Sequence, residues 1–303
     1  MKRLIAFYAA VFALNCFSIL PRPLAYALAC GAVDVYYLFD KRHRRVGLIN
    51  LQIAFPGQSD AWRQRILKRS YRNLGKLVVE VSKFPKLTSK IISRRVSYSE
   101  GSLQRYLRAK EKRLGLLYLT AHISSWELLP FAHALYGHPL SFLVRPLNNP
   151  DLNRVLDSYR VRSGNRVIPK KNAIRPMLKV LKEKGDVGIL IDQNVSPEEG
   201  VFAPLFGKEA CTTNGLAMIA LRAQAPVLPA FLLPAKKLGH YLIYFGEEVP
   251  LCQSGSVEEN VRDTTARFNQ VLEDIVRQYP ECWLWVHKRW KTRPPGDEQI
   301  VYP

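Results

Sequence analysis

Two nearly continuous apolar runs open the chain, at residues 4–20 and 24–39, and the motif Pro21-Arg22-Pro23 separates them. As a helix the first run would be roughly 26 Å long, which is close to the hydrocarbon thickness of a bilayer. A basic cluster at residues 41–45 follows at once, as it does at the cytoplasmic edge of membrane segments. We therefore expect residues 1–40 to form an N-terminal hydrophobic membrane-anchor helix.

The same apolar runs are compatible with two different structures. Lys2-Arg3 before the first run and Ala27-Leu28-Ala29 inside the second resemble a secretory signal peptide and its cleavage site, although apolar sequence continues past that site. A buried pair of helices in a soluble protein would show the same pattern. The break at Pro21-Arg22-Pro23 also leaves open whether the segment spans the bilayer or only enters it.

Apolar residues from 41 to 95 recur instead at the three- and four-residue steps of amphipathic helices. Phe55-Pro56-Gly57 predicts the end of one helix, and Ser59 or Asp60 can cap the next. Residues 60–95 hold eleven Lys or Arg against two acidic residues, so these helices are strongly basic. We expect residues 41–95 to form basic amphipathic helices that pack on a larger body.

From residue 114 onward, short apolar runs alternate with longer stretches of helical spacing. This alternation predicts an α/β protein in which a mixed sheet is flanked by helices. We place the α/β domain at residues 96–303. The expected strands are 114–119, 140–144, 186–192, 227–233, 241–245 and 282–287, and the expected helices are 125–136, 150–163, 172–184, 213–223 and 257–278.

A histidine and a carboxylate follow the first expected strand, as His122 and Glu127. The imidazole changes charge near neutral pH and suits proton abstraction, and a nearby carboxylate can fix its tautomer and stabilise the imidazolium. In a chain of this composition the spacing is expected by chance about half a time, so its context has to decide. The plain alternative is a strand-end histidine with a surface glutamate on the next helix.

Polar side chains also follow the next two long strands. Arg145 ends one strand and Arg162 lies on the helix after it, and a guanidinium fork suits a phosphate or carboxylate. Asp192 and Gln193 end the other strand and would face the same crevice as His122, as candidates for contact with the substrate. Ordinary surface arginines and a turn-forming aspartate would look the same in sequence.

Residues 200–207 form an apolar stretch bracketed by glycines, with Gly200, Phe202 and Phe206 as its most distinctive members. An exposed apolar loop is a liability unless it lines a pocket, here a pocket for a lipid chain. A loop folded onto the core is the alternative.

The formal net charge is +20, which points to an anionic partner such as nucleic acid or a membrane surface. The apolar N-terminus favours an anionic membrane surface, so we expect no nucleic-acid partner. The five cysteines form no C-x-x-C pair, which fits a reducing compartment. Serine-hydrolase, nucleotide-loop and H-E-x-x-H motifs do not occur, and we expect neither a cofactor nor a metal.

Taken in order, these segments resemble the bacterial lipid A late acyltransferases, the lauroyl and myristoyl transferases of the lysophospholipid acyltransferase superfamily. The resemblance covers nearly the whole chain and departs at Ile123-Ser124-Ser125, where the family usually shows an aromatic residue, Gly and Asn. The residues that carry it are Asn50-Leu51, Phe55-Pro56, His122 to Glu127, Arg145-Pro146, Asn149-Pro150, Arg162, Asp192-Gln193, Gly200 to Gly207, Pro226 to Phe231, and Trp283 to Pro294.

This resemblance implies a glycerol-3-phosphate acyltransferase-like fold and transfer of a fatty acyl chain from acyl carrier protein to a hydroxyl of a lipid A precursor. His122 would remove the hydroxyl proton and Glu127 would orient His122. Arg145 and Arg162 would hold a phosphate, backbone groups near Gly200 could stabilise the oxyanion, and residues 200–207 would line the acyl channel. The implied location is the bacterial inner membrane, with the catalytic domain on the cytoplasmic side.

Two further functions remain compatible with the sequence. One is a lysophospholipid or other membrane-lipid O-acyltransferase that uses acyl-CoA. The second is a membrane-tethered nucleic-acid binder without enzymatic activity, which would account for the charge but not for the His122 motif or the apolar stretch.

Overall fold

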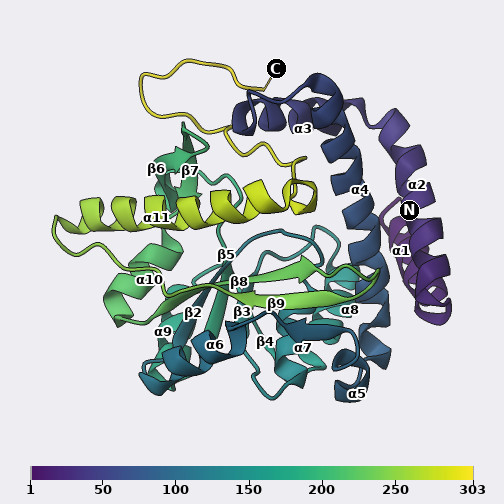
Figure 1. The fold of residues 1–303 in the computed structure, drawn as a ribbon, viewed down its shortest axis with the longest axis horizontal. Coiled ribbons are helices and arrows are strands. Elements are labelled where there is room, and N and C mark those ends of the chain that lie inside the picture. Colours follow the sequence, from purple (N-terminus) through teal and green to yellow (C-terminus); the bar gives the residue numbers. More distant parts are fainter. Residues whose placement is uncertain (1, 303) are drawn as a thin grey trace.

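A mixed seven-stranded sheet forms the centre of the molecule, which a computed structural model describes over residues 2–302 (Figure 1). The strand order is β1-β9-β8-β2-β5-β3-β4, and every neighbouring pair is parallel except β8 and β9. The strands are β1 (Val96–Tyr98), β2 (Leu116–Thr120), β3 (Ser141–Val144), β4 (Arg166–Pro169), β5 (Asp186–Leu190), β8 (Val227–Pro234) and β9 (Tyr241–Phe245). The predicted α/β class with a mixed sheet is confirmed.

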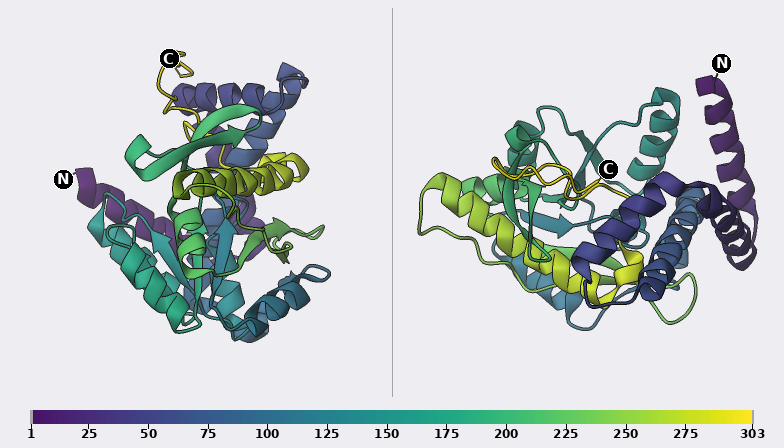
Figure 2. Two further views of the ribbon diagram at one scale, coloured as in Figure 1. Left: turned by 90° about the vertical axis from the view of Figure 1, so that its left-hand side faces the viewer. Right: turned by 90° about the horizontal axis from the view of Figure 1, so that it is seen from above.

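Helices cover both faces of this sheet (Figure 2). The helices are α6 (Ser102–Glu111), α7 (Leu128–Leu135) and α8 (Pro150–Val161) on one face, and α9 (Ile174–Lys182), α10 (Gly215–Ala223) and α11 (Val257–Gln278) on the other. In β2, Leu116 and Tyr118 pack into the cluster of the first face, whereas Leu117 and Leu119 pack into that of the second. Because side chains alternate across a strand, burial on both faces requires a continuous apolar run.

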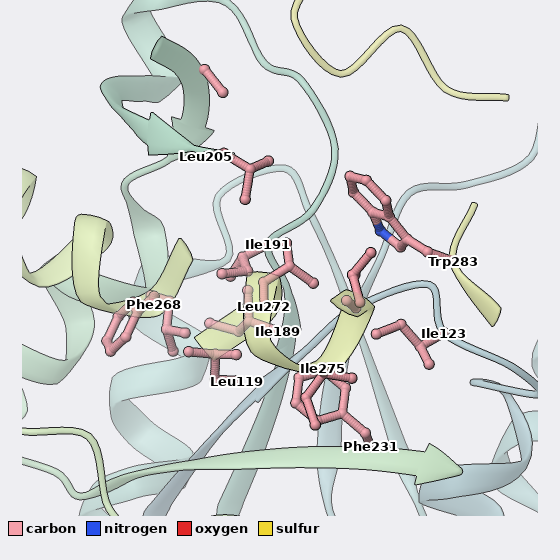
Figure 3. Packing of buried hydrophobic residues seen from close by; sticks show 14 of the residues in the cluster. Leu119, Ile123, Ile189, Ile191, Leu205, Phe231, Phe268, Leu272, Ile275 and Trp283 are labelled. Carbon is pink, nitrogen blue, oxygen red and sulfur yellow. The ribbon is translucent and has the colours of Figure 1, made fainter. Parts of the chain in front are cut away.

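Helix α11 packs against the central strands and closes the larger core cluster (Figure 3). Phe268, Leu272 and Ile275 of this helix join Leu119 of β2 and Ile189 of β5, and each of these side chains is at most 4% exposed. Burial of each contributes roughly 1.5–3 kcal/mol. The loops that follow β2 and β5 therefore start from a rigid base.

Smaller elements connect this framework. A separate antiparallel hairpin consists of β6 (Gly200–Leu205) and β7 (Lys208–Thr213), and the short helices are α5 (Ser89–Ile92), η1 (Phe84–Lys86), η2 (Pro197–Glu199) and η3 (Pro280–Cys282). The strand predicted at residues 282–287 is wrong, because this segment forms turns with a single bridge between Trp283 and Ile123. Trp283 and Trp285 are nonetheless buried, so a buried turn carried the apolar pattern of a strand.

The apolar N-terminus forms two helices, α1 (Lys2–Ile19) and α2 (Arg22–Phe39), which meet at residues 20–21. In the described part of the chain, no helix combines the length and the apolar character needed to cross a membrane. Where we expected one membrane-anchor helix over residues 1–40, the structure has a pair of helices. Proline inside the first turn of α2 starts a new helix there, since proline is tolerated in a first turn but interrupts a helix interior.

Helix α4 (Asp60–Lys83) holds this pair against the rest of the molecule, and α3 (Lys41–Ala54) precedes it (Figure 1). Gly75 of α4 lets α2 approach closely, since an added Cβ would lie 3.2 Å from the Ala29 carbonyl oxygen. Lys83 Nζ and Lys86 Nζ donate to the Ser18 carbonyl oxygen at 3.2 and 3.1 Å. Lys83 of α4 and Lys86 of the 3₁₀ helix that follows it (η1, Phe84–Lys86) thus cap the C-terminal end of α1, where cations are favoured.

Asn50 of α3 ties the C-terminal segment to the N-terminal helices. Its amide nitrogen donates to the carbonyl oxygens of Trp285 and His287 at 2.6 and 2.7 Å, and its amide oxygen accepts from the Tyr302 hydroxyl. The residue is 1% exposed, so each of these groups would lose its partner without gaining water.

We predict that Asn50→Leu lowers the free energy of unfolding by about 2–5 kcal/mol, because several buried polar groups lose a partner at about 1–3 kcal/mol each. Denaturant unfolding followed by tryptophan fluorescence measures this loss. Gln52→Leu is the matched control, since Gln52 lies on the same helix with an exposed side chain. Equal midpoints for the two variants would contradict the proposed tie.

Candidate active site

The register between β2 and β5 brings the two most informative loop residues together. Thr120 pairs with Leu190 at the ends of these parallel strands, and His122 and Asp192 each follow two residues later. The Ile191 amide still donates to the Thr120 carbonyl oxygen at 3.1 Å, which extends the pairing by one residue. Carboxyl ends of parallel strands meet at one edge of a sheet, so the imidazole and the carboxylate become neighbours.

Asp192 holds His122 through two hydrogen bonds and is itself held by a third, from Trp283. Its Oδ1 lies 2.8 Å from His122 Nδ1, and its Oδ2 accepts from the His122 amide at 3.0 Å and from Trp283 Nε1 at 2.8 Å. An ionised carboxylate only accepts, so Nδ1 carries the proton and Nε2 keeps its lone pair. Gln193 Nε2 lies 3.5 Å from this free nitrogen. The arrangement suits a general base that acts through Nε2.

The charges of this pair reinforce one another. Burial would lower the pKa of His122, but the charge and hydrogen bond of Asp192, together with the charge of Glu127, raise the pKa above its ordinary value. Burial would raise the pKa of Asp192, yet His122 and the hydrogen bonds to the carboxylate lower that pKa to about 2. Asp192 therefore stays ionised and stabilises the imidazolium that proton abstraction creates.

The Glu127 carboxylate binds Arg160 rather than His122, the residue that we expected it to orient. Its carboxylate accepts from Arg160 Nε at 2.9 Å and from Arg160 Nη2, and Arg160 Nη1 also donates to Asp157 at 3.0 Å. The group that orients His122 is therefore Asp192, for which the sequence predicts contact with the substrate. Glu127 follows the His122 loop at the start of α7 and acts on His122 only through its charge. Sequence spacing could not distinguish these two carboxylates, because the β2–β5 register selects between them.

The loop after His122 has a constrained backbone. Ser124 has a φ of 55°, in the left-handed region that favours glycine, and its amide donates to the Cys282 carbonyl oxygen at 2.8 Å. The resemblance placed a Gly at this position, so the serine keeps the same shape at a conformational cost of roughly 1 kcal/mol. The Trp126 ring packs edge-on against the His122 ring, with centroids 5.0 Å apart. The loop that carries His122 is thus held by the C-terminal segment at Ser124 and by the contact of Trp126 with His122.

The two predicted phosphate-binding arginines differ in position. Arg145 directly follows β3, the neighbour of β5, and its side chain is exposed at the same edge of the sheet as His122. Arg162 ends α8, and its guanidinium lies 3.5 Å from the Pro85 carbonyl oxygen. The arginine of α8 that reaches the His122 motif is Arg160, two residues earlier on another face of the helix.

The stretch Gly200 to Gly207 is strand β6 and the turn of the β6–β7 hairpin rather than a loop, with positive φ at Phe206 and Gly207 in the turn. Gly200 is required for packing, since an added Cβ would lie 2.7 Å from the Thr212 carbonyl oxygen. The Phe206 ring is buried against Phe55 and Trp283, so Phe206 belongs to the core. Phe202 is only partly buried, on the same side of the strand as the exposed Pro204.

The C-terminal segment contributes contacts that single residue motifs did not reveal. Trp283 holds Asp192, and His287 Nε2 accepts from the Asn194 amide at 2.8 Å. Arg289 is 1% exposed and donates to the Cys211 carbonyl oxygen at 3.0 Å. The closely spaced tryptophans after α11 are the available signal, but the partners of Trp283 and His287 lie about ninety residues earlier. Across residues 2–302, no His, Cys, Asp and Glu side chains group as metal ligands.

Comparison with known proteins gives one consistent match. Residues 1–292 match the family model described as bacterial lipid A biosynthesis acyltransferase. The chain is 28% identical over 284 residues to the lipid A biosynthesis lauroyltransferase of Escherichia coli K12, covering 91% of this chain and 88% of that protein. The palmitoleoyltransferase of the same strain is 27% identical over 285 residues (93% and 89%), and its myristoyltransferase is 23% identical over 259 residues (86% and 78%).

We predict that Asp192→Asn lowers the pKa of His122, because the variant removes the charge that opposes the burial of the imidazolium. An NMR titration of the His122 ring measures this, with the signal assigned by its loss in His122→Ala. Asp274→Asn removes an exposed carboxylate on α11 and should leave the pKa of His122 unchanged. A His122 pKa that is equal or higher in Asp192→Asn would overturn the assignment of Asp192.

Proposed function

The chain belongs to the bacterial lipid A biosynthesis acyltransferase family and is an acyltransferase of that pathway, and from this premise we propose how its residues perform the transfer. The donor is acyl carrier protein loaded with a fatty acyl chain, and the acceptor is a hydroxyl of a lipid A precursor. The observation that carries this proposal is the His122–Asp192 pair at the sheet edge, in which Asp192 holds the proton on Nδ1 and leaves the lone pair on Nε2.

In the proposed reaction, His122 Nε2 takes the proton of the acceptor hydroxyl as its oxygen attacks the thioester carbonyl. The tetrahedral intermediate then collapses, the carbon–sulfur bond breaks, and the imidazolium returns the proton to the leaving thiolate. Asp192 stabilises the imidazolium throughout. The acceptor is itself the nucleophile, so the reaction forms no acyl-enzyme. The pKa of His122 is raised above its ordinary value of about 6.5. On acidification His122 should therefore become protonated, and activity should be lost, at a higher pH than an ordinary histidine would give.

The remaining site residues take supporting roles in this proposal. Arg145, exposed beside the pair, binds a phosphate of the acceptor or donor, and Arg162 would have to turn from Pro85 to assist. Gln193 stands close enough to Nε2 to hold the acceptor hydroxyl. Phe202, on the outward side of β6, contacts the acyl chain. Backbone groups near Gly200 remain our candidates for the oxyanion site.

We further propose that α1 and α2 lie in the interface of the inner membrane on its cytoplasmic side. Helix α2 buries one side against α4, and α1 packs on α4 with half-buried side chains. Both helices leave large apolar side chains exposed. These exposed residues are Leu4, Tyr8, Phe12 and Ile19 of α1 and Leu24, Leu28, Val35, Tyr36, Leu38 and Phe39 of α2. The exposed cations Lys41, Arg42 and Arg45 follow directly, which suits anionic lipid headgroups.

Replacement of the proposed base tests the chemistry. We expect His122→Ala to lower the rate of acyl transfer in a purified assay by about 10²- to 10⁴-fold, because loss of a general base typically costs that much. His43→Ala, which changes an exposed histidine of α3, should keep its activity.

The identity of the acceptor is tested in cells, where mass spectrometry of lipid A from cells that lack the gene should show one acyl chain fewer. Near-normal transfer by His122→Ala would contradict the proposed mechanism, and unchanged lipid A would contradict the proposed identity of the acceptor.

A charge on the exposed helix face tests the membrane proposal. We expect the double variant Phe12→Asp/Leu28→Asp to bind phosphatidylglycerol vesicles at least about 100-fold more weakly, because each side chain would lose roughly 1.5–3 kcal/mol of apolar burial. Val257→Asp/Ile300→Asp changes two apolar residues that are at least as exposed and lie outside these helices, and it is the control. Vesicle sedimentation measures both variants. Equal losses would place the membrane contact elsewhere.

A further inference from the structure

Two cavities flank the connection between β8 and β9, and neither is lined by His122. One, of about 240 Å³, lies between this connection, α4 and the loop after His122, and the other, of about 280 Å³, lies between the connection and the segment before β1. Both are lined by Lys236, Lys237, His240 and Tyr241, so the two cavities lie on the two sides of the same turn and together make up one region of the molecule. We call this region the β8–β9 pocket.

The charged side chains around the β8–β9 pocket are all basic. Lys76, Arg94 and Arg95 line it together with Lys236 and Lys237, and neither cavity includes an aspartate or glutamate. Among residues 2–302, none of these five cations forms an ion pair with a carboxylate. Such uncompensated positive charge favours an anionic ligand.

His240 reports the same positive field. Burial lowers its pKa, and the charges of Lys237, Arg95 and Arg22 lower that pKa further. Arg22 has a partner in Glu80, which lies 3.3 Å away, but no acidic group offsets the effect of these cations on His240. An anion bound in the pocket would relieve this repulsion.

Hydroxyl groups from the catalytic loop complete the pocket. Ser124 and Ser125 line the cavity next to α4, only two and three residues after His122. Ser125 Oγ donates to the Tyr241 hydroxyl at 3.1 Å, so the loop and β9 are joined at the pocket wall. Because the Ser125 hydroxyl proton is donated to Tyr241, Ser124 is the serine that can donate to a ligand, and lysines with such a neighbouring hydroxyl suit phosphate oxygens.

The position of the β8–β9 connection points to a ligand carried by a lipid. Gly239 is buried beside α2, where an added Cβ would lie 3.1 Å from the Tyr26 hydroxyl oxygen. Leu238, one residue earlier, is 57% exposed and stands beside Lys236 and Lys237. An apolar tip flanked by lysines suits the interface of an anionic membrane. The pocket therefore lies next to the helix whose apolar face we assign to the bilayer.

We propose that the β8–β9 pocket binds a phosphate group of the membrane-borne acceptor lipid and thereby presents that lipid to the His122 loop. The proposal rests on the proposed function for the identity of the lipid as the acyl acceptor. It adds a second anion site beside the one at Arg145, on the opposite side of β2 in the strand order.

The test is vesicle binding by Lys236→Ala/Lys237→Ala, with phosphatidylcholine vesicles that contain phosphatidic acid as the probe. We expect about 30-fold weaker binding, because each lysine near such a surface is worth about a factor of five. Lys182→Ala/Arg222→Ala removes two exposed cations from α9 and α10, away from α1 and α2 in Figure 1, and should bind normally. Equal losses in both variants would mean general charge attraction and would overturn the pocket.

A second arm separates a lipid phosphate from free phosphate. If calorimetry shows inorganic phosphate binding that depends on Lys236 and Lys237 while vesicle binding does not, the lipid assignment is overturned. In the acyl-transfer assay, Lys236→Ala/Lys237→Ala should raise the KM for the acceptor lipid about 30-fold and leave kcat within about twofold. A lower kcat at unchanged KM would contradict a binding role.

Failure of this proposal can be told apart from failure of the proposed function. His122→Ala should bind phosphatidic acid vesicles as the unchanged protein does, because the histidine does not line the pocket. If the lysine substitutions weaken vesicle binding as expected, but neither the unchanged protein nor any variant transfers an acyl chain, the proposed function is overturned and the phosphate site stands. If the unchanged protein transfers acyl chains, but the lysine substitutions change neither vesicle binding nor KM, the phosphate site is overturned and the proposed function stands.

Discussion

The hydrogen bond between His122 and Asp192 is the interaction on which the rest of the site depends. It exists because β2 and β5 pair in parallel with Thr120 opposite Leu190, which carries both polar residues past the same sheet edge. The buried cluster below, closed by α11, keeps that register fixed. A shift of one residue would turn each side chain to the other face of the sheet and separate the pair.

The C-terminal segment stabilises this pair from outside the sheet. Trp283 donates to the Asp192 carboxylate, and the Cys282 carbonyl accepts from Ser124 in the loop that carries His122. Asn50 then fixes the same segment to α3 through its two carbonyl contacts. Helix α3, which directly follows the two helices that we assign to the membrane, is therefore linked to the candidate catalytic loop through one buried, irregular stretch of chain.

The positive charge of the chain has several separate roles in the structure. Lys83 and Lys86 bind the end of α1, and Arg160 binds Glu127, so these cations already have partners within the protein. Arg145 and the cations of the β8–β9 pocket are left without a carboxylate partner among the described residues. Net charge predicts an anionic partner, but only the pairing pattern shows which cations are free to meet it.

The sequence by itself determined the α/β class, the strands around residues 114–119 and 186–192, and the polar residues that end them, because apolar periodicity and local motifs are properties of neighbouring residues. It could not choose Asp192 over Glu127 as the partner of His122, since that choice depends on strand register between segments seventy residues apart. It likewise read the buried turn at Trp283 as a strand and the hairpin at Gly200 as a loop, because burial alone gives both an apolar pattern. Only the tertiary structure decided these points, since long-range pairing and packing fix them.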